Sequence, residues 1–113
     1  MWSKKTEIAK QMQKNRRKGM KVVTLCGSLK FEKEMIEISQ KLELEKKYCV
    51  IQCIYGLKEV TPKQAETLAK IHYQKIDISD AIYVVNIGGY IGESCKKEIE
   101  YAKSKNKEII YHE

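Results

Sequence analysis

A glycine-rich turn followed by a glutamate is the clearest group of residues in this chain that can do chemistry. The turn occupies residues 88–94, directly after the apolar stretch 81–86, and Glu98 follows about one helical turn later. Glycine and serine let backbone amides approach an anion closely at a helix N-terminus, where the helix dipole favours negative charge. The pattern therefore predicts a phosphate site, with the Glu98 carboxylate facing the group that carries the phosphate. The residues expected around the phosphate at this turn are Gly89, Gly92 and Ser94.

A second glycine turn ends another apolar stretch, residues 21–26. Its sequence at residues 26–30, CGSLK, offers backbone amides, a hydroxyl and an ammonium, which are groups that bind an anionic phosphate. One glycine-rich turn after a strand is a weak sign of phosphate binding, and two such turns are a stronger one. The candidate ligands at this turn are Cys26, Gly27, Ser28 and Lys30.

Three further side chains near the turns have alternative roles. Tyr90 can stack on a base or a ribose, or it can pack across a dimer interface. Ser94 can cap the last helix, with or without a phosphate beside it. Asn86, at the end of the preceding apolar stretch, can hydrogen-bond a ribose or simply hold the turn.

Apolar patterns predict the elements that must position these residues. Short β-branched stretches indicate buried strands, and apolar residues spaced three or four apart among charged ones indicate amphipathic helices. Thr61, Pro62 and Gln64 form a capping box with proline at the first helical position, so a helix begins there. The expected strands are 21–26, 48–55, 81–86 and 108–111, and the expected helices are 31–46, 62–79 and 93–104.

Strands that alternate with helices predict a three-layer α/β domain with a parallel sheet. We expect a flavodoxin- or Rossmann-like sheet of four strands in the order 2-1-3-4. In that order the first and third strands are neighbours and their connections leave toward opposite faces, which opens a crevice at their carboxyl ends. Both glycine turns should therefore meet at this crevice.

Three short motifs resemble one known family of proteins. They are the turn at residues 26–30, the pair 80–81 (DA) that opens the third strand, and the segment 98–102 (EIEYA) in the last helix. In this order they resemble the nucleoside 2-deoxyribosyltransferase-like superfamily, and the first motif is most similar to the branch that hydrolyses 2'-deoxynucleoside 5'-phosphates. The turn at 88–94 followed by Glu98 is also similar to that of the nucleoside monophosphate phosphoribohydrolases. The resemblance extends over nearly the whole chain beyond its first 19 residues.

The resemblance implies an enzyme that breaks the bond between a sugar and a base. By position, Glu98 matches the glutamate that attacks the anomeric carbon in the transferase family. Loss of the base creates oxocarbenium character, which a nearby carboxylate stabilises or captures. The expected partner is a nucleoside or a nucleoside 5'-monophosphate, with water or a second base as acceptor and without a cofactor or a metal. The resemblance also implies that subunits pair into a homodimer or a larger assembly.

Two positions depart from the family pattern. The first strand carries Thr24 where the family usually has a tyrosine near the glutamate. His72 stands eight residues before Asp80, where the family has an aspartate that assists at the sugar and the leaving base. His72 can act as the general acid near neutral pH, or it can be a packing or surface histidine. The alternative to an enzyme is a non-catalytic module that senses or sequesters a nucleotide in the same crevice.

The positive charge of the chain is concentrated at its N-terminus. The formal net charge is +7, and residues 1–18 carry seven basic side chains against one acidic side chain. The remaining residues are nearly neutral, so we expect a basic tail, residues 1–19, and a single nucleotide-binding domain, residues 20–113. The tail is either a solvated helix or disordered arm, or an arm that touches RNA or a membrane surface.

Composition excludes several kinds of site. None of the four cysteines forms a CxxC pair, so the sequence predicts neither a zinc site nor a redox dithiol. Cys49 and Cys53, four residues apart in a predicted strand, should share one face but lie too far apart for a disulfide. No apolar run approaches the roughly 20 residues that a membrane span needs, and no signal peptide is evident. We therefore expect a cytoplasmic protein without disulfides or metal.

Deleting residues 1–19 tests the role of the basic tail. We expect any affinity of the full chain for an RNA oligonucleotide to disappear in the shortened chain, because the rest of the sequence is nearly neutral. Binding through the tail should also fall steeply with rising salt, since it depends on phosphate contacts. Fluorescence anisotropy at two salt concentrations measures both effects, and RNA binding retained by residues 20–113 would contradict the prediction.

Overall fold

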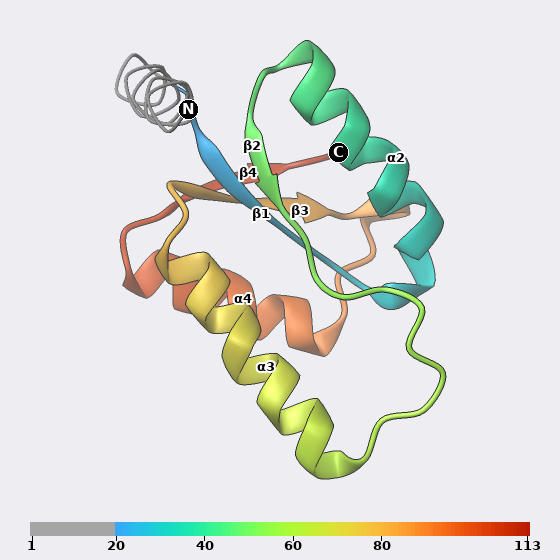
Figure 1. Ribbon diagram of the computed structural model, residues 1–113. Coiled ribbons are helices and arrows are strands. Elements are labelled where there is room, and N and C mark those ends of the chain that lie inside the picture. Colours follow the sequence, from blue (N-terminus) through green and yellow to red (C-terminus); the bar gives the residue numbers. More distant parts are fainter. Residues whose placement is uncertain (1–19) are drawn as a thin grey trace, which may run out of the picture.

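Helices flank a parallel sheet in the computed structural model, which describes residues 20–113 (Figure 1). The predicted basic tail, residues 1–19, lies outside the described residues. The strands are β1 (Val22–Gly27), β2 (Cys49–Ile51), β3 (Ala81–Val85) and β4 (Glu108–Tyr111). The helices are α2 (Glu32–Glu45), α3 (Pro62–Asp77) and α4 (Glu93–Ser104), and two short 3-10 turns, η1 (Leu29–Phe31) and η2 (Ile87–Gly89), follow β1 and β3.

The arrangement of the strands confirms the predicted fold class. All neighbouring strands are parallel, and they lie in the order β2-β1-β3-β4. β1 and β3 pair from Val23 opposite Ala81 to Gly27 opposite Val85. The two strands therefore end side by side, and the turns that follow them begin at the same edge of the sheet.

Each face of the sheet packs against different helices, which gives three layers. Because side chains alternate along β1, Leu25 packs on the α2 side while Cys26 packs on the side of α3 and α4. Figure 1 shows α2 on one side of the sheet and α3 and α4 together on the other. The buried side chains are Met35, Ile38, Leu42 and Val85 on the α2 side, and Ile76, Ile82, Val84, Cys95, Ile99 and Ala102 on the other.

The predicted capping box begins α3. The amide of Gln64 donates to Thr61 Oγ1 at 3.1 Å, the amide of Thr61 donates to Gln64 Oε1 at 3.0 Å, and Pro62 occupies the first helical position. These contacts satisfy amides that have no partner within the helix. Among the described residues, no helix is both long and apolar enough to cross a membrane.

α4 has the predicted bounds but not the predicted cap. Its buried side chains, Cys95, Ile99 and Ala102, are spaced three or four residues apart and form one stripe that packs in the core. The N-cap residue is Gly92, so the prediction that Ser94 caps α4 is wrong. The helix begins earlier because Gly92 already has the extended backbone of an N-cap residue, and Glu93 then stands at the first helical position, where its charge favours the helix dipole.

β2 is shorter than the predicted strand at residues 48–55. It ends at Ile51, which pairs with Thr24 of β1. Immediately beyond it the carbonyl of Gln52 accepts a hydrogen bond from Lys75 Nζ of α3 at 2.6 Å. The chain leaves the sheet here because the carbonyl of Gln52 bonds to a side chain of α3 and not to the backbone of β1.

The shorter strand corrects the prediction for two cysteines. Cys49 is exposed in β2, whereas Cys53 lies beyond the end of the strand and is half-buried against the α2 side of the core. The two residues therefore do not share a strand face. All four cysteines have free thiols in the structure.

Replacing Ile82 with alanine tests how the sheet is packed. Ile82 is fully buried in β3, so Ile82→Ala should leave a cavity and lower the free energy of unfolding by about 2–5 kcal/mol. The control Leu44→Ala, at a position of α2 that is 78% exposed, should change it by about 0.5 kcal/mol or less. Urea unfolding followed by far-ultraviolet circular dichroism measures both. Equal losses in the two variants would contradict this packing.

Candidate active site

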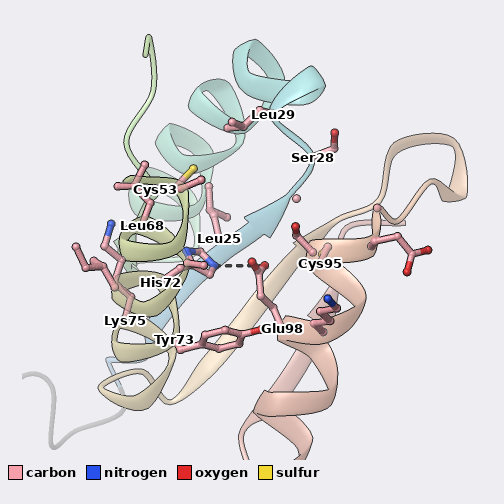
Figure 2. Close-up of a pocket in the computed structure, with 18 of the residues that line it drawn as sticks. Leu25, Ser28, Leu29, Cys53, Leu68, His72, Tyr73, Lys75, Cys95 and Glu98 are labelled. Atoms are coloured by element: carbon pink, nitrogen blue, oxygen red, sulfur yellow. Dashed lines mark ion pairs between the residues drawn. The ribbon is translucent and has the colours of Figure 1, made fainter. Parts of the chain in front are cut away.

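A cavity of about 700 Å³ opens beside the carboxyl end of β1, between α3 and α4 (Figure 2). This volume lies within the roughly 300–1,000 Å³ that is typical of small-molecule sites. Residues of α3 and α4 form facing walls, and the turn after β1 lies at one end. The predicted site residues that line the cavity are Gly27, Ser28, His72, Tyr90, Gly92, Ser94 and Glu98.

Three chemically active side chains meet at one place: His72 and Glu98 line the floor of the cavity, and Cys26 lies buried directly beneath it. His72 Nε2 lies 3.4 Å from Glu98 Oε1 and 3.4 Å from Cys26 Sγ. The side chains of His72 and Glu98 are 11% and 17% exposed, and Cys26 is 1% exposed. They belong to α3, α4 and β1, and Figure 2 shows His72 and Glu98 pointing toward one another. The structure thus brings together the two residues that the sequence analysis considers for catalysis.

Buried hydrogen bonds hold α3 against β1 and so position His72. The hydroxyls of Thr24 and Ser79 lie 2.6 Å apart, and both reach the carbonyl of Lys75, at 3.1 Å and 2.7 Å. Lys75, whose carbonyl accepts both hydroxyls, stands about one helical turn after His72 in α3. Thr24 is fully buried and does not line the cavity. Its hydroxyl therefore fastens the helix at the position where the resembled family has a tyrosine.

Tyr73 supplies an aromatic neighbour for Glu98 that the sequence analysis missed. Its ring packs against Tyr101 with a centroid distance of 4.7 Å, and Figure 2 shows it beside Glu98. Burial raises the pKa of the Tyr73 phenol, and the negative charge of Glu98 raises it further. The phenol therefore stays protonated and can donate a hydrogen bond in this part of the cavity.

The two glycine turns frame one end of the cavity. Gly27 lies so close to β3 and α2 that an added Cβ would stand 3.2 Å from Val85 Cβ and 3.3 Å from the sulfur of Met35. Across the cavity, α4 begins at Gly92 without a side-chain cap. The amides of its first turn are therefore not engaged by a capping oxygen, and such amides bind anions.

Lys30 and Tyr90 join the two turns to each other. Lys30 Nζ lies 3.4 Å from the centroid of the Tyr90 ring, which meets Phe31 edge-on at 6.0 Å. The ammonium thus makes a cation–π contact. Lys30, predicted to bind phosphate, is not among the residues that line the cavity. Tyr90 lines it and is 45% exposed, while packing within its own subunit.

Three other predicted ligands also lie outside the cavity lining. Asn86 Oδ1 accepts the amide of Glu113 at 2.8 Å, and its Nδ2 donates to the carbonyl of Glu113 at 3.1 Å, so Asn86 fixes the C-terminus. Gly89 is exposed in η2 with a φ of 80°, a conformation that favours glycine. Cys26 faces the α3 side of β1 and contacts His72 instead of a position for phosphate.

Sequence reasoning missed part of the α3 wall. Leu68 and Lys75 line the cavity together with His72, and the spacing of these three residues places them on one face of the helix. Once His72 is chosen as a site residue, this spacing predicts that Leu68 and Lys75 lie on the same face of the helix. The grouping of Cys26 with His72 and Glu98 had no local signal, because the three residues stand far apart in the sequence.

The comparisons with known proteins leave the resemblance of motifs unsupported by a wider match. No protein-family model matches this chain, and no curated protein matches it. The geometry of the cavity and the three short motifs are therefore the features of this chain that bear on its function.

The buried cysteines should resist alkylation in the folded protein. Burial, followed by the charge of Glu98, raises the pKa of Cys95 from 9.0 to about 12, and the same two causes raise the pKa of Cys26. At pH 8 the Cys95 thiol should therefore form thiolate roughly a thousandfold less often than an ordinary cysteine.

Iodoacetamide followed by mass spectrometry measures this difference. The exposed Cys49 should be labelled first, and Cys26 and Cys95 should be labelled only after unfolding in urea. Labelling of Cys95 as fast as Cys49 in the folded protein would contradict the burial described above.

Proposed function

We propose that this protein cleaves the N-glycosidic bond of a nucleoside or nucleoside 5'-monophosphate, or transfers the sugar to a second base, with Glu98 as the nucleophile. The observation that carries the proposal is the position of the Glu98 carboxylate, 3.4 Å from His72 at the floor of a cavity that ends at the two glycine turns. The resemblance to the nucleoside 2-deoxyribosyltransferase-like superfamily supports the same role, because the matching glutamate of that family attacks the anomeric carbon.

The chemistry requires a nucleophile and a proton donor on neighbouring walls. A Glu98 oxygen bonds to the anomeric carbon while the carbon–nitrogen bond breaks and its electron pair leaves with the base. His72 then supplies the proton that the departing base needs, since an imidazole exchanges protons near neutral pH. Water or a second base then attacks the anomeric carbon, the bond from that carbon to Glu98 breaks and frees the carboxylate, and the now neutral His72 takes the proton that the acceptor loses.

Tyr73 orients the nucleophile in this proposal. A protonated phenol next to a carboxylate can donate a hydrogen bond to it and so restrict its rotation. Tyr73 comes from α3 and not from β1. It would replace the tyrosine that the resembled family has at the position of Thr24. This arrangement accounts for a fully buried Thr24 without loss of an aromatic residue beside Glu98.

The phosphate of a nucleotide would bind between the two turns. Gly27 and Ser28 on one side, and Gly92 and Ser94 on the other, line this end of the cavity. The absence of a side-chain cap on α4 favours an anion there. A nucleoside 5'-monophosphate placed in this way presents its sugar to Glu98, one helical turn beyond Ser94.

Exposed apolar side chains support a homo-oligomer. Leu29, Ile54 and Ile71 line the cavity although they are 62%, 54% and 43% exposed. Within α3, Ile76 is the one buried residue. A second copy of the chain would cover this apolar mouth and the outer face of α3, and it would exclude water from the cavity.

Replacing the proposed nucleophile tests the function directly. Incubation with a panel of nucleosides and nucleoside 5'-monophosphates, read by chromatography, should show base release by the unaltered protein. Glu98→Ala should reduce kcat by about a thousandfold or more, because the covalent route is lost. Glu100→Ala, on the exposed face of the same helix, is the matched control and should leave base release unchanged.

The same panel separates the second candidate function from the first. The module that senses or sequesters a nucleotide is favoured by the two departures from the family pattern, Thr24 in place of a tyrosine and His72 in place of an aspartate. Tight binding of a nucleotide without release of its base would select this module. Equal base release by the unaltered protein and by Glu98→Ala would remove Glu98 from the mechanism.

A further inference from the structure

His72 Nε2 has two close neighbours of different chemistry. Cys26 Sγ and Glu98 Oε1 each lie 3.4 Å from it, on two different elements. An imidazole nitrogen carries either one N–H or one lone pair in the plane of the ring, so it serves one of these neighbours well but not both. The two polar groups therefore compete for a single ring atom at the floor of the cavity.

The distances among the three donor atoms fit the ligands of a tetrahedral ion. Zinc bonds of about 2.3 Å to sulfur and about 2.1 Å to nitrogen or oxygen place neighbouring ligand atoms about 3.4–3.6 Å apart. Both contacts of Nε2 have this length, and all three donor atoms lie within 4.8 Å of one another. The third distance, between the Glu98 carboxylate and Cys26 Sγ, is the longest. The Glu98 side chain has several rotatable bonds, and a movement of its carboxylate by about 1 Å brings this distance to the same length.

We propose that Cys26, His72 and Glu98 bind one divalent cation of the zinc class, with the fourth coordination position open to the cavity. Three protein ligands and one open position are typical of catalytic rather than structural zinc sites. A thiolate and an imidazole favour zinc or cobalt(II), whereas magnesium and calcium prefer oxygen ligands. On binding, the thiol of Cys26 loses its proton to solvent as the sulfur joins the ion.

The three ligands are largely buried and come from three packed elements, so they would hold an ion in one position. Cys26 comes from the centre of the sheet and is 1% exposed, while the side chains of His72 and Glu98 are 11% and 17% exposed. The ligands belong to β1, α3 and α4, so the folded domain brings them together before any ion arrives. The cavity provides the entry path.

A bound cation would exclude the chemistry proposed for Glu98. The same carboxylate cannot coordinate an ion and attack an anomeric carbon at the same time. This consequence rests on the proposed function. The cation site itself does not, because it depends only on the three donor atoms.

Titration of the full chain with Co²⁺ tests the site without any nucleotide. A cobalt–thiolate bond gives a charge-transfer band in the near ultraviolet, and tetrahedral coordination gives strong bands in the visible range. We expect one equivalent of Co²⁺ to bind with a Kd of about 10 μM or tighter and to be displaced by Zn²⁺. Cys26→Ala should abolish the charge-transfer band, and Glu98→Gln should weaken binding by about tenfold or more.

Matched controls use the same residue types outside the cavity. Cys49→Ala and His112→Ala alter an exposed thiol and an exposed imidazole, and both should keep the band and the affinity. Glu98→Gln is conservative at a partly exposed position, so it keeps the test decisive if Cys26→Ala does not fold. Failure of the unaltered chain to bind one equivalent overturns the proposal, as does a band that survives in Cys26→Ala or disappears in Cys49→Ala. Base release is measured separately, so failure of the proposed function is distinguishable.

Discussion

The parallel pairing of β1 with β3 is the interaction on which the rest of the structure depends. Its register places Gly27 opposite Val85, so that both glycine turns start from one edge of the sheet. The carboxylate of Asp80 reinforces this register, because Oδ2 accepts the amide of Val22 at 2.8 Å. A slip of one residue would send every side chain of β1 to the opposite face, and Cys26 would leave the side of α3 and α4. The cavity and the groups at its floor follow from this one alignment.

The position of α3 is the second constraint, and it depends on polar contacts with β1 and β2 as well as on the apolar packing of Ile76 and Tyr73. Within α3 the buried residue is Ile76, yet the helix carries one of the reactive groups of the site. The hydroxyls of Thr24 and Ser79 and the ammonium of Lys75 tie it to β1 and to Gln52 beyond β2. Unpaired, these buried groups would cost folding free energy, so they select one position of the helix. That position brings His72 over Cys26 and opposite Glu98.

Most of the fold was predictable because local patterns and global packing agree. Short, mainly apolar stretches marked β1, β3 and β4, and the capping box at Thr61 marked the start of α3. The alternation of strands with helices then leaves few topologies, and the observed order β2-β1-β3-β4 is the expected one. β2 was the weakest prediction, since its apolar stretch continues to Tyr55 while the strand ends at Ile51. Pairing with a neighbour, not composition, decides where a strand stops.

For the site, the sequence by itself determined which residue types stand after β1 and β3, and that Glu98 follows the second glycine turn by about one helical turn. Only the tertiary structure decided which of these residues face the cavity. Lys30 lies over Tyr90, and Asn86 holds Glu113, because long or polar side chains take whichever partner the folded chain brings near. The grouping of Cys26 with His72 and Glu98 was likewise decided by packing. Its members come from β1, α3 and α4, and sequence spacing carries no information about contacts between elements that meet only when the sheet and both helices assemble.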